Sequence, residues 1–477
     1  MRQLVWLRND LRTIDNSALH HAMQQGPTLA LYILSPVQWQ LHDEAAIKLD
    51  FRLRNLQQLA ERLQLLNVPL IVTQCDLWQE LPQRLPEFCR TWQVSSLHFN
   101  AEYGVNEQQR DRQCAEQLEA AGIRVYRHGD SCLFPPGSLR TQQGQMFQVF
   151  TAFKKACWQR LHAAPLRSLP PPVAQAPTGI ASQLQAIQPY LAHNPDRERL
   201  WPAGEDAAWQ QLERFCRQDI HNYQQERDFP ALDNTSRLSP ALACGVLSVR
   251  SCWQRALLAN QGEFDSGSEG VVTWLTELLW REFYQHLLAL NPRLSKGEPF
   301  LESGKRIPWR NDPGQLHAWQ QGRTGFPLID AAMRQLAATG WMHNRLRMVV
   351  AMFFCKNLLL DWRLGERWFM QQLIDGDLAA NNGGWQWCAS TGTDAAPYFR
   401  VFNPVTQSQR FDPKGEFIRR WLPELAHLDD KQIHLPQHGH DLFSGSYPAP
   451  IVDLKSSRAR AIEAFSRANG SLNSLSS

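Results

Sequence analysis

The first 130 residues alternate short β-rich runs with helical patterns, and this alternation ends near residue 130. The runs typical of strands are residues 4–7, 29–34, 70–73, 97–100 and 124–127, with helical patterns such as 46–66 and 107–121 between them. Such alternation is typical of a doubly wound parallel sheet. We therefore expect an α/β domain over residues 1–130. No G-x-G-x-x-G motif follows the first run, so the pattern assigns no nucleotide to this domain.

The rest of the chain follows a different pattern. Periodicity weakens over residues 131–200, where Pro accumulates, and we expect an interdomain connector laid over the surface. Helical periodicity without β-rich runs predicts one all-α domain over residues 201–453. A short polar C-terminal tail, residues 454–477, is expected to fray. Because 477 residues exceed one ordinary core, the length also favours more than one domain.

Composition narrows the class of protein. The chain is 43% apolar and 20% charged, and it has no apolar run near the ~20 residues that a membrane span needs. Its first residues carry charge and no signal-peptide pattern, which predicts a cytoplasmic protein with no membrane partner. Ten scattered Cys without a C-x-x-C pair favour reduced thiols over disulfides or a zinc site.

Charge and tryptophan content give two further indications. With a net charge of +3, any DNA-binding face must be local. Residues 323–367 hold seven Lys or Arg against three acids, which fits such a face or an ordinary solvated helix surface. Of 18 Trp, 11 lie between Trp253 and Trp421. Bulky, oxidisable indoles can pack, stack on a ligand or relay an electron.

The run Asp375–Asn403 combines acids, amides and indoles in one short stretch. Asn381 and Asn382 precede a Gly pair and then Trp385 and Trp387. A packed interior accepts so many polar side chains only when each is hydrogen-bonded, and two indoles are unusual on a water-facing loop. The run therefore fits a flat, polar-edged aromatic ligand, or a Gly-containing turn with two half-buried Trp.

Three shorter stretches place polar groups among apolar ones. In residues 340–349, read as a helix, Trp341, Asn344, Arg345 and Met348 share one face, which fits a ligand wall or an outward polar face. In residues 274–284, Trp274, Glu277, Leu278 and Arg281 share a face with Trp280 at its edge. Glu277 then either shares a proton with a substrate or forms a surface pair with Arg281. Residues 234–239, NTSRLS, fit an anion site or a simple helix cap at Ser239.

These motifs occur in the order found in the DNA photolyase/cryptochrome family. The resemblance runs from WLRNDLR at Trp6–Arg12 to about Glu424 and is strongest over residues 274–411. It implies an α/β antenna domain and a helical domain that holds flavin adenine dinucleotide (FAD) in a bent form. The implied FAD contacts are Tyr223, Thr235, Ser236, Arg237, Leu238, Ser239, Trp274, Arg281, Trp341, Arg347, Asp375, Gly376, Asp377 and Asn381, the last facing flavin N5.

The branches of this family differ at a few positions. Glu277, Trp280, Asn344 and Met348 match photolyases for cyclobutane pyrimidine dimers, whereas photolyases for (6-4) lesions have His at the positions of Asn344 and Met348. His343 has a different helix angle, and we expect it to be structural. Plant cryptochromes have Asp where this chain has Asn381, and many cryptochromes add a long signalling tail. The chain thus resembles most the bacterial class I dimer photolyases of folate-antenna type.

The resemblance implies a light-driven reaction on DNA. Excited reduced flavin passes an electron to a flipped-out dimer, the cyclobutane ring splits, and the electron returns. Glu277 would stabilise the charged dimer, and Asn344 and Met348 would shape its pocket. The other implied DNA contacts are Arg227, Trp280, Arg345, Trp387 and Gln407, with Glu277 and Asn344 among them. The rival interpretations are a blue-light sensor that signals through a partner and a helical nucleic-acid binder without a cofactor.

Two further sets of residues are implied by the resemblance. Trp385, Trp362 and Trp309 match an electron relay from flavin to surface. His42, Asn106, Glu107 and Lys296 match the contacts of a 5,10-methenyltetrahydrofolate antenna. Ser295 and Gly297 depart from the commoner pattern, so a deazaflavin antenna, or none, stays open. We expect a monomer without an obligate protein partner.

Overall fold

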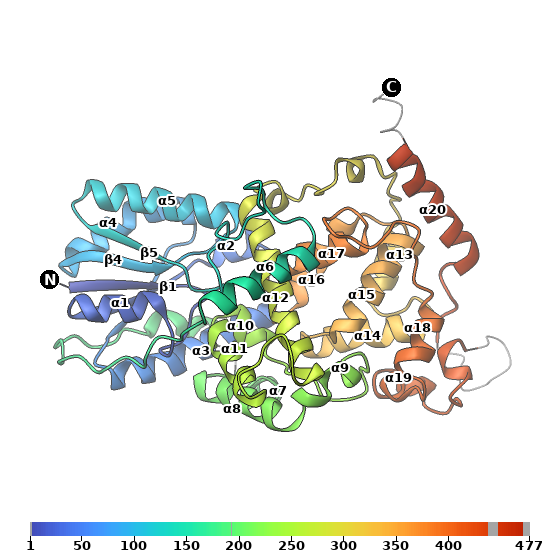
Figure 1. Ribbon diagram of the computed structural model, residues 1–477, viewed down its shortest axis with the longest axis horizontal. Helices are drawn as coiled ribbons and strands as arrows, with labels where there is room; N and C mark the ends of the chain where they lie inside the picture. Colours follow the sequence, from blue (N-terminus) through green and yellow to red (C-terminus); the bar gives the residue numbers. More distant parts are fainter. Residues whose placement is uncertain (1, 192, 437–446, 471–477) are drawn as a thin grey trace. The chain divides into compact units, whose positions relative to one another are not determined.

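The computed structural model describes residues 2–191, 193–436 and 447–470 (Figure 1). Its contacts divide the chain into two compact units that interleave along the sequence. Unit 1 contains residues 1–221, 236–292 and 374–379, and unit 2 contains residues 222–235, 293–373 and 380–477.

Unit 1 contains a five-stranded parallel sheet, which confirms the predicted fold of the N-terminal part. Its strands are β1 (Arg2–Leu7), β2 (Thr28–Leu34), β3 (Leu70–Gln74), β4 (Val94–Asn100) and β5 (Arg124–His128). The strand order is β3-β2-β1-β4-β5, and every pairing is parallel. The central strands are buried along nearly their whole length because helices cover both faces of the sheet.

The covering helices follow the strands in sequence. They are α1 (Ser17–Gln25), α2 (Pro36–Leu41), α3 (Ala46–Leu65), α4 (Leu81–Thr91) and α5 (Val105–Ala120). Figure 1 shows α4 and α5 on one side of the sheet and α1 and α3 on the other. The strand order changes direction between β1 and β4, because β2 and β3 are added on one side of β1 and β4 and β5 on the other. Doubly wound sheets bind ligands at the carboxyl ends of the strands at such a switch point.

The stretch expected as a surface connector contains a buried helix, which corrects that expectation. Helix α6 (Phe150–Ala163) packs on α12 (Glu269–Leu290), and Phe153 and Cys157 are almost completely buried. The Phe150 ring stacks on the Trp280 ring with 3.6 Å between centroids. The other helical segments among the described residues of this stretch are η2 (Gln185–Tyr190) and α7 (Pro195–Leu200).

Buried charge links the sheet to the helices that share unit 1 with it. These helices are α8 (Glu205–Gln218), α10 (Ser239–Ala243), α11 (Val249–Ala259) and α12. Arg250 of α11 pairs with Asp15 at 3.0 Å and with Asp130 at 2.8 Å. On α12, the fully buried Glu282 accepts hydrogen bonds from the backbone N–H groups of Leu133 and Phe134 at 2.9 and 2.8 Å. Each buried carboxylate is thus neutralised or fully hydrogen-bonded, as burial requires.

The regular secondary structure described in unit 2 is helical, apart from an isolated bridge between Arg310 and Leu360. Its helices are α9 (Tyr223–Glu226), α13 (Pro313–Gln320), α14 (Pro327–Thr339), α15 (Asn344–Met352), α16 (Trp362–Gln372), α18 (Pro404–Phe411), α19 (Glu416–Trp421) and α20 (Leu454–Gly470), together with most of α17 (Leu378–Cys388). The short turns are η4 (Leu294–Lys296), η5 (Glu302–Arg306), η7 (Pro423–Leu425), η8 (Gln432–His434) and a π-helical turn, η6 (Phe353–Asn357). Their core is rich in Phe, Leu, Met and Trp.

The C-terminal region also differs from expectation. Residues 454–470, predicted to fray, form helix α20, which buries Ala461, Phe465 and Ala468 in unit 2. The Phe465 ring lies 3.6 Å from Nζ of the buried Lys356. Residues 471–477 lie outside the described part. Among the described helices, none combines the length and the apolar character needed to cross a bilayer.

Candidate functional site

The residues matched to FAD contacts fall in both units. In unit 1, residues 236–238 precede α10, and Ser239 is its first residue. Arg237 has a positive φ of 49°, and the Ser236 carbonyl accepts a hydrogen bond from Gln211 at 2.8 Å. Helix α10 has only five residues, so its macrodipole is small. The hydroxyls and the Arg237 cation are therefore the groups in this segment suited to an anion.

Helix α12 presents a partly exposed polar and aromatic row. Glu277, Trp280 and Arg281 are half-buried, whereas Trp274 is buried beside Phe215. Arg281 donates to the carbonyl of Ser131 at 2.7 Å, which orients the guanidinium toward unit 1's own loop. Since Phe150 covers one face of Trp280, the indole keeps at most one face for stacking on a base.

The segment 375–377 is held from two sides in unit 1. The buried Lys48 of α3 donates to the carbonyl of Gly376 at 2.5 Å. Gln285 of α12 donates to both carboxylate oxygens of Asp377 at 3.0 and 3.2 Å. Asp375 is 7% exposed. The sequence motifs did not indicate Lys48 or Gln285, although Lys48 lies in the predicted helical pattern 46–66 and Gln285 directly follows the stretch 274–284.

In unit 2, the start of α15 corrects the predicted helix. Gly340, in the left-handed region, ends α14, and α15 begins only at Asn344. Trp341 therefore precedes the helix and does not share its face. His343 is the N-cap: its Nδ1 accepts the backbone N–H of Arg345 at 3.2 Å. Burial lowers the pKa of His343 to about 3, so it acts as a neutral acceptor, in agreement with its expected structural role.

The helix α15 exposes the residues expected at the lesion. Asn344 is exposed, and Arg345, Arg347 and Met348 are half-buried, with apolar residues on the opposite side. Arg347 donates to the Met342 carbonyl at 2.8 Å. The row Asn344, Arg345 and Met348 therefore forms a partly open surface of an amide, a cation and a thioether.

Glu366, a residue that the sequence motifs did not indicate, binds both Asn of α17, one through its backbone carbonyl and the other through its carboxyl. Asn381 donates through Nδ2 to the backbone carbonyl of Glu366 at 2.9 Å, and Asn382 donates to the Glu366 carboxyl at 2.8 Å. Asn382 in turn accepts from Gln386 at 2.9 Å. Burial raises the pKa of Glu366 to about 7. The bond from Nδ2 fixes the orientation of the Asn381 side-chain amide. Its Oδ1 then points away from Glu366 and can accept a hydrogen bond.

These residues fit a flavin. The reduced flavin N5–H is a donor, and the Asn381 carbonyl is an acceptor fixed for it. Gly384, three residues further along α17, has no described atom within 4 Å of the position that a Cβ would take. A flat ring can therefore approach this helix closely. In unit 1, taken by itself, the hydroxyls and the Arg237 cation of residues 236–239 suit a diphosphate.

The three Trp matched to a relay all lie in unit 2. Trp385 is 2% exposed, Trp362 is fully buried, and Trp309 is half-buried. Trp385 packs edge-on against Trp319, Phe354 and Phe369. Nε1 of each of the three Trp is buried without a hydrogen-bond partner among the described residues. Trp385 and Trp362 are buried and only Trp309 is partly exposed, so a path along the three would reach the surface at Trp309.

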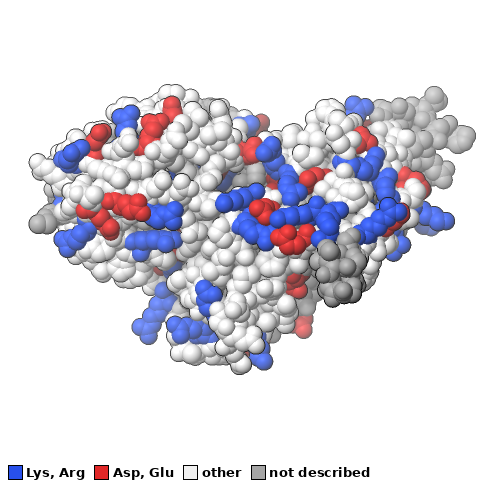
Figure 2. Space-filling view, turned by 90° about the horizontal axis from the view of Figure 1, so that it is seen from above, with Lys and Arg blue, Asp and Glu red and all other residues white. Residues whose placement is uncertain are grey.

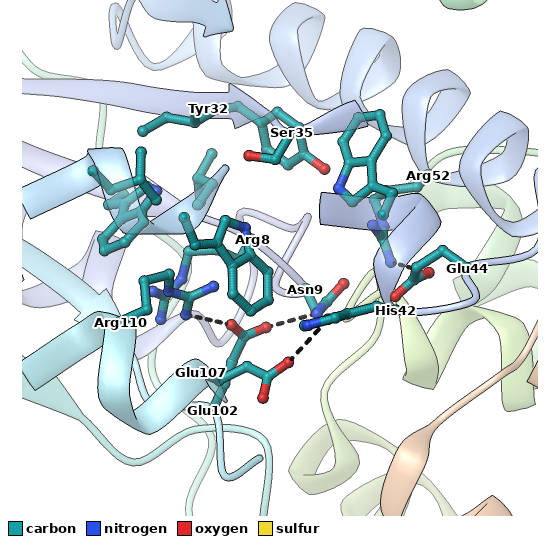
Figure 3. Close-up of a pocket in the computed structure, with 16 residues that line it drawn as sticks. Arg8, Asn9, Tyr32, Ser35, His42, Glu44, Arg52, Glu102, Glu107 and Arg110 are labelled. Carbon is teal, nitrogen blue, oxygen red and sulfur yellow. Dashed lines mark hydrogen bonds and ion pairs between the residues drawn. The ribbon is translucent and has the colours of Figure 1, made fainter. Parts of the chain in front are cut away.

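Of the residues matched to an antenna in unit 1, His42 and Glu107 line a pocket at the carboxyl ends of β1, β2 and β4 (Figure 3), and Asn106 adjoins it through His42. The pocket has a volume of about 60 Å³. His42 lies 3.8 Å from Glu107 and 3.2 Å from Asn106. Burial and the neighbouring Glu102 carboxylate raise the pKa of Glu107 to about 7. Lys296 ends η4 in unit 2 and is not grouped with the others.

The inner wall of this pocket is made of paired charges. Glu102 accepts from Arg110 at 2.7 Å and from Asn9 at 2.6 Å, and Glu44 accepts from Arg52 at 3.0 Å. Burial opposes the charge on Glu102, but Arg110 and Arg8 outweigh it and lower its pKa to about 2. Such a wall presents charges of fixed position to a ligand. Trp78 adds apolar surface, and Cζ of Arg110 lies 4.4 Å from its ring centroid.

Part of the local excess of basic residues is buried or paired, whereas Arg323 and Arg367 are exposed. Lys356 is fully buried, Arg334 pairs with Glu424 at 2.7 Å, and Arg345 pairs with Asp228 at 2.7 Å. On the face drawn in Figure 2, Lys and Arg gather with Asp and Glu among them. The other expected DNA contacts of unit 2 are half-buried: Arg227 lies over the Tyr223 ring at 5.3 Å, Gln407 is on α18, and Trp387 packs at the edge of the core.

Comparisons with known proteins agree with this architecture. Residues 3–174 match the DNA photolyase family model, and residues 274–467 match the FAD binding domain of DNA photolyase. The chain is 46% identical over 471 residues to a deoxyribodipyrimidine photo-lyase of Vibrio cholerae, covering 98% of this chain and 100% of that protein.

Solved structures extend the comparison to the fold. A class III photolyase of Agrobacterium tumefaciens matches with a TM-score of 0.87 at 32% identity and covers 98% of both chains. An archaeal photolyase of Sulfolobus tokodaii, solved with two FAD molecules, matches with a TM-score of 0.81 at 28% identity, covering 98% of this chain and 100% of that one. The chain therefore belongs to the DNA photolyase/cryptochrome family.

Proposed function

We propose that this chain has deoxyribodipyrimidine photo-lyase activity and repairs cyclobutane pyrimidine dimers in DNA under light. The observation that carries the proposal is the match along the whole chain to the Vibrio cholerae photo-lyase. The half-buried Glu277 among the aromatics of α12 and the open row Asn344–Met348 of α15 support it. When bound and reduced, FAD supplies the photoexcited electron.

The chain's own residues bind and orient the reacting groups in this proposal. Asn381 accepts a hydrogen bond from flavin N5, and Asp375, Gly376 and Asp377 hold the cofactor near its flavin. Glu277 stabilises the negative charge that develops on the dimer, an electrostatic contribution of the kind that preorganised groups make. Trp280, through its uncovered face, and Trp387 stack on the extruded bases. Bound FAD would both supply and take back the electron, so the reaction would need no external oxidant or reductant.

The test is repair of a defined substrate. Reduced protein is illuminated with an oligonucleotide that contains one thymine dimer, and recovery of ultraviolet base absorbance is followed. We expect recovery in light and none in the dark, with a lower yield per absorbed photon in Glu277→Gln. The control is Glu269→Gln, an exposed residue at the start of the same helix, which should behave as wild type. Absence of recovery with reduced flavin bound rejects the proposal in favour of a light sensor.

We also propose that the pocket at His42, Asn106 and Glu107 holds a folate antenna, 5,10-methenyltetrahydrofolate. The small volume and the charged inner wall favour a ligand held at the pocket mouth through polar ring groups. Extraction of the purified protein followed by mass spectrometry identifies the chromophore. A deazaflavin or a second FAD in the extract would replace the folate in this proposal.

The proposal includes a cytoplasmic monomer. Ten buried thiols are compatible with a reducing compartment. Light scattering coupled to size-exclusion chromatography tests the oligomeric state, and cell fractionation tests the location.

A further inference from the structure

The expected DNA contact Arg345 is already engaged in a two-point ion pair within unit 2. Its Nε donates to Oδ1 of Asp228 at 3.1 Å, and its Nη2 donates to Oδ2 of the same carboxylate at 2.7 Å. The two side chains are 20% and 29% exposed. A bidentate pair of this burial fixes the orientation of the guanidinium as well as neutralising its charge.

The remaining surfaces of the Arg345 guanidinium are also defined. Its carbon Cζ lies 4.6 Å from the Phe411 ring centroid, so the end of α18 covers one of its planes. Its Nη1 points to the Met348 sulfur at 3.8 Å. The edge that Asp228 leaves unoccupied is therefore directed along α15 toward Met348, which is expected to touch the lesion. Asp228 decides which edge of the cation a nucleic acid can reach.

We propose that Asp228 is a specificity-determining residue that reserves Arg345 for damaged DNA. This inference rests on the proposed function, because it needs Arg345 to contact DNA. The pair is nearly neutral to any phosphate backbone at a distance, so Asp228 withholds one cation from non-specific binding. A DNA group at the lesion that lies beside Met348 can still accept a hydrogen bond from Nη1 of Arg345, whose orientation Asp228 fixes. Asp228 is a positioning residue and takes no part in the photochemistry.

The expected effect follows from the salt dependence of DNA binding. Neutralising one more phosphate with a Lys or Arg steepens the slope of log affinity against log salt by about 0.9. In Asp228→Asn the amide no longer cancels the Arg345 charge. We therefore expect affinity for undamaged duplex to rise about 3- to 10-fold at low salt, with a slope steeper by about 1. Affinity for dimer-containing duplex should change less, so the ratio of the two affinities falls.

The experiment measures binding of both duplexes over a range of salt with holoenzyme in the dark. It compares wild type, Asp228→Asn, Arg345→Gln and the double variant. The matched control is Glu424→Gln, which breaks the Arg334 pair of similar burial elsewhere in unit 2. We expect the change in slope in Asp228→Asn alone, and we expect Arg345→Gln to abolish it in the double variant. Thermal unfolding of each variant shows whether it remains folded.

The outcomes separate the two proposals. If wild type shows no preference for dimer-containing DNA, the proposed function fails. If that preference exists but Asp228→Asn keeps the wild-type slope and ratio, the inference about Asp228 is wrong. The inference is equally wrong if the change persists in the Arg345→Gln background or if Glu424→Gln reproduces it, because the effect would then be one of net charge.

Discussion

The amide of Asn381 donates to the backbone carbonyl of Glu366 at 2.9 Å. The bond joins the helix that carries the expected flavin contact to the middle of α16. Because the acceptor is a backbone atom, substitution of the Glu366 side chain leaves this bond in place. The side chain itself accepts from Asn382, so its protonation can be studied separately from the orientation of Asn381.

Protonation of Glu366 should make stability depend on pH. Burial raises its pKa from 4.5 to about 7, so the folded state binds the proton more tightly than the unfolded state. The resulting stability is complete below about pH 4.5 and is lost as the pH rises through about 7. Between about pH 5 and pH 8 we expect Tm to fall more in wild type than in Glu366→Gln. The exposed Glu416→Gln serves as control, and an equal fall in Glu366→Gln would contradict the assignment.

The relay can be tested at its partly exposed end. Trp309→Phe should slow photoreduction of oxidised flavin at least about tenfold, because a benzyl ring is much harder to oxidise than an indole. Repair by enzyme reduced beforehand should be unchanged. The measurement is the bleaching of oxidised flavin under blue light with an external reductant. Trp421→Phe, another half-buried Trp of unit 2, should photoreduce normally. Normal photoreduction in Trp309→Phe would refute this path.

Sequence patterns predicted the sheet well because each strand is a short run that can be recognised from its own residues. All five predicted runs lie within the observed strands, since strands covered on both faces are short apolar runs. Helix α6 was missed although Phe150, Phe153, Cys157 and Leu161 form its buried face, because Pro-rich segments and polar residues surround the pattern. At α15 the predicted helix began too early, since the left-handed Gly340 and the cap at His343 were overlooked.

For the candidate site, the sequence indicated the motif residues but not the residues that hydrogen-bond to them. Family motifs indicated Asn381 and Arg345, whereas their partners Glu366 and Asp228 have no motif of their own. Asp228 and Arg345 lie 117 residues apart, so no local periodicity can pair them. Lys48 and Gly376 are 328 residues apart. Long-range hydrogen bonds of this kind follow from the tertiary fold.

Two Glu of α12 should have separable effects. Glu282 is fully buried and accepts two backbone N–H groups, so Glu282→Ala leaves these donors unsatisfied. We expect the free energy of unfolding to fall by about 3 kcal/mol. Glu277 is half-buried on the same helix, and Glu277→Gln should lower repair with little change in stability. Urea unfolding of both variants checks this, and wild-type stability of Glu282→Ala would contradict the role of these bonds.

Retention of the antenna should depend on pH through Glu107. Since its pKa is about 7, the Glu107 carboxyl loses its proton as the pH rises from about 6 to about 8 and can then no longer donate a hydrogen bond. We expect less antenna to stay bound at the higher pH, measured as the ratio of antenna to flavin absorption after gel filtration. Glu107→Gln, which cannot ionise, should show no such trend, and Glu107→Ala should lose the antenna at every pH. A trend that persists in Glu107→Gln would assign the effect to another group.

The ring of Trp385 depends on the absence of a side chain at position 365. A Cβ on Gly365 would lie 2.1 Å from Cη2 of Trp385 and 2.4 Å from its Cζ3, so Gly365→Ala must displace the indole. The ring is 2% exposed and surrounded by Trp319, Phe354 and Phe369, which leaves little space for the shift. We expect destabilisation of about 1–3 kcal/mol from overpacking.

The variant Gly365→Ala should slow photoreduction of the flavin more than it lowers repair. Because Trp385 is the first member of the expected relay, its displacement should slow photoreduction, whereas enzyme reduced beforehand should still repair dimers. Time-resolved absorption of the indole radical measures the first transfer directly. Leu364→Ala, at the neighbouring exposed residue, is the control for helix α16. A wild-type rate of radical formation in Gly365→Ala would show that electrons reach the flavin without the Trp385 ring in this position.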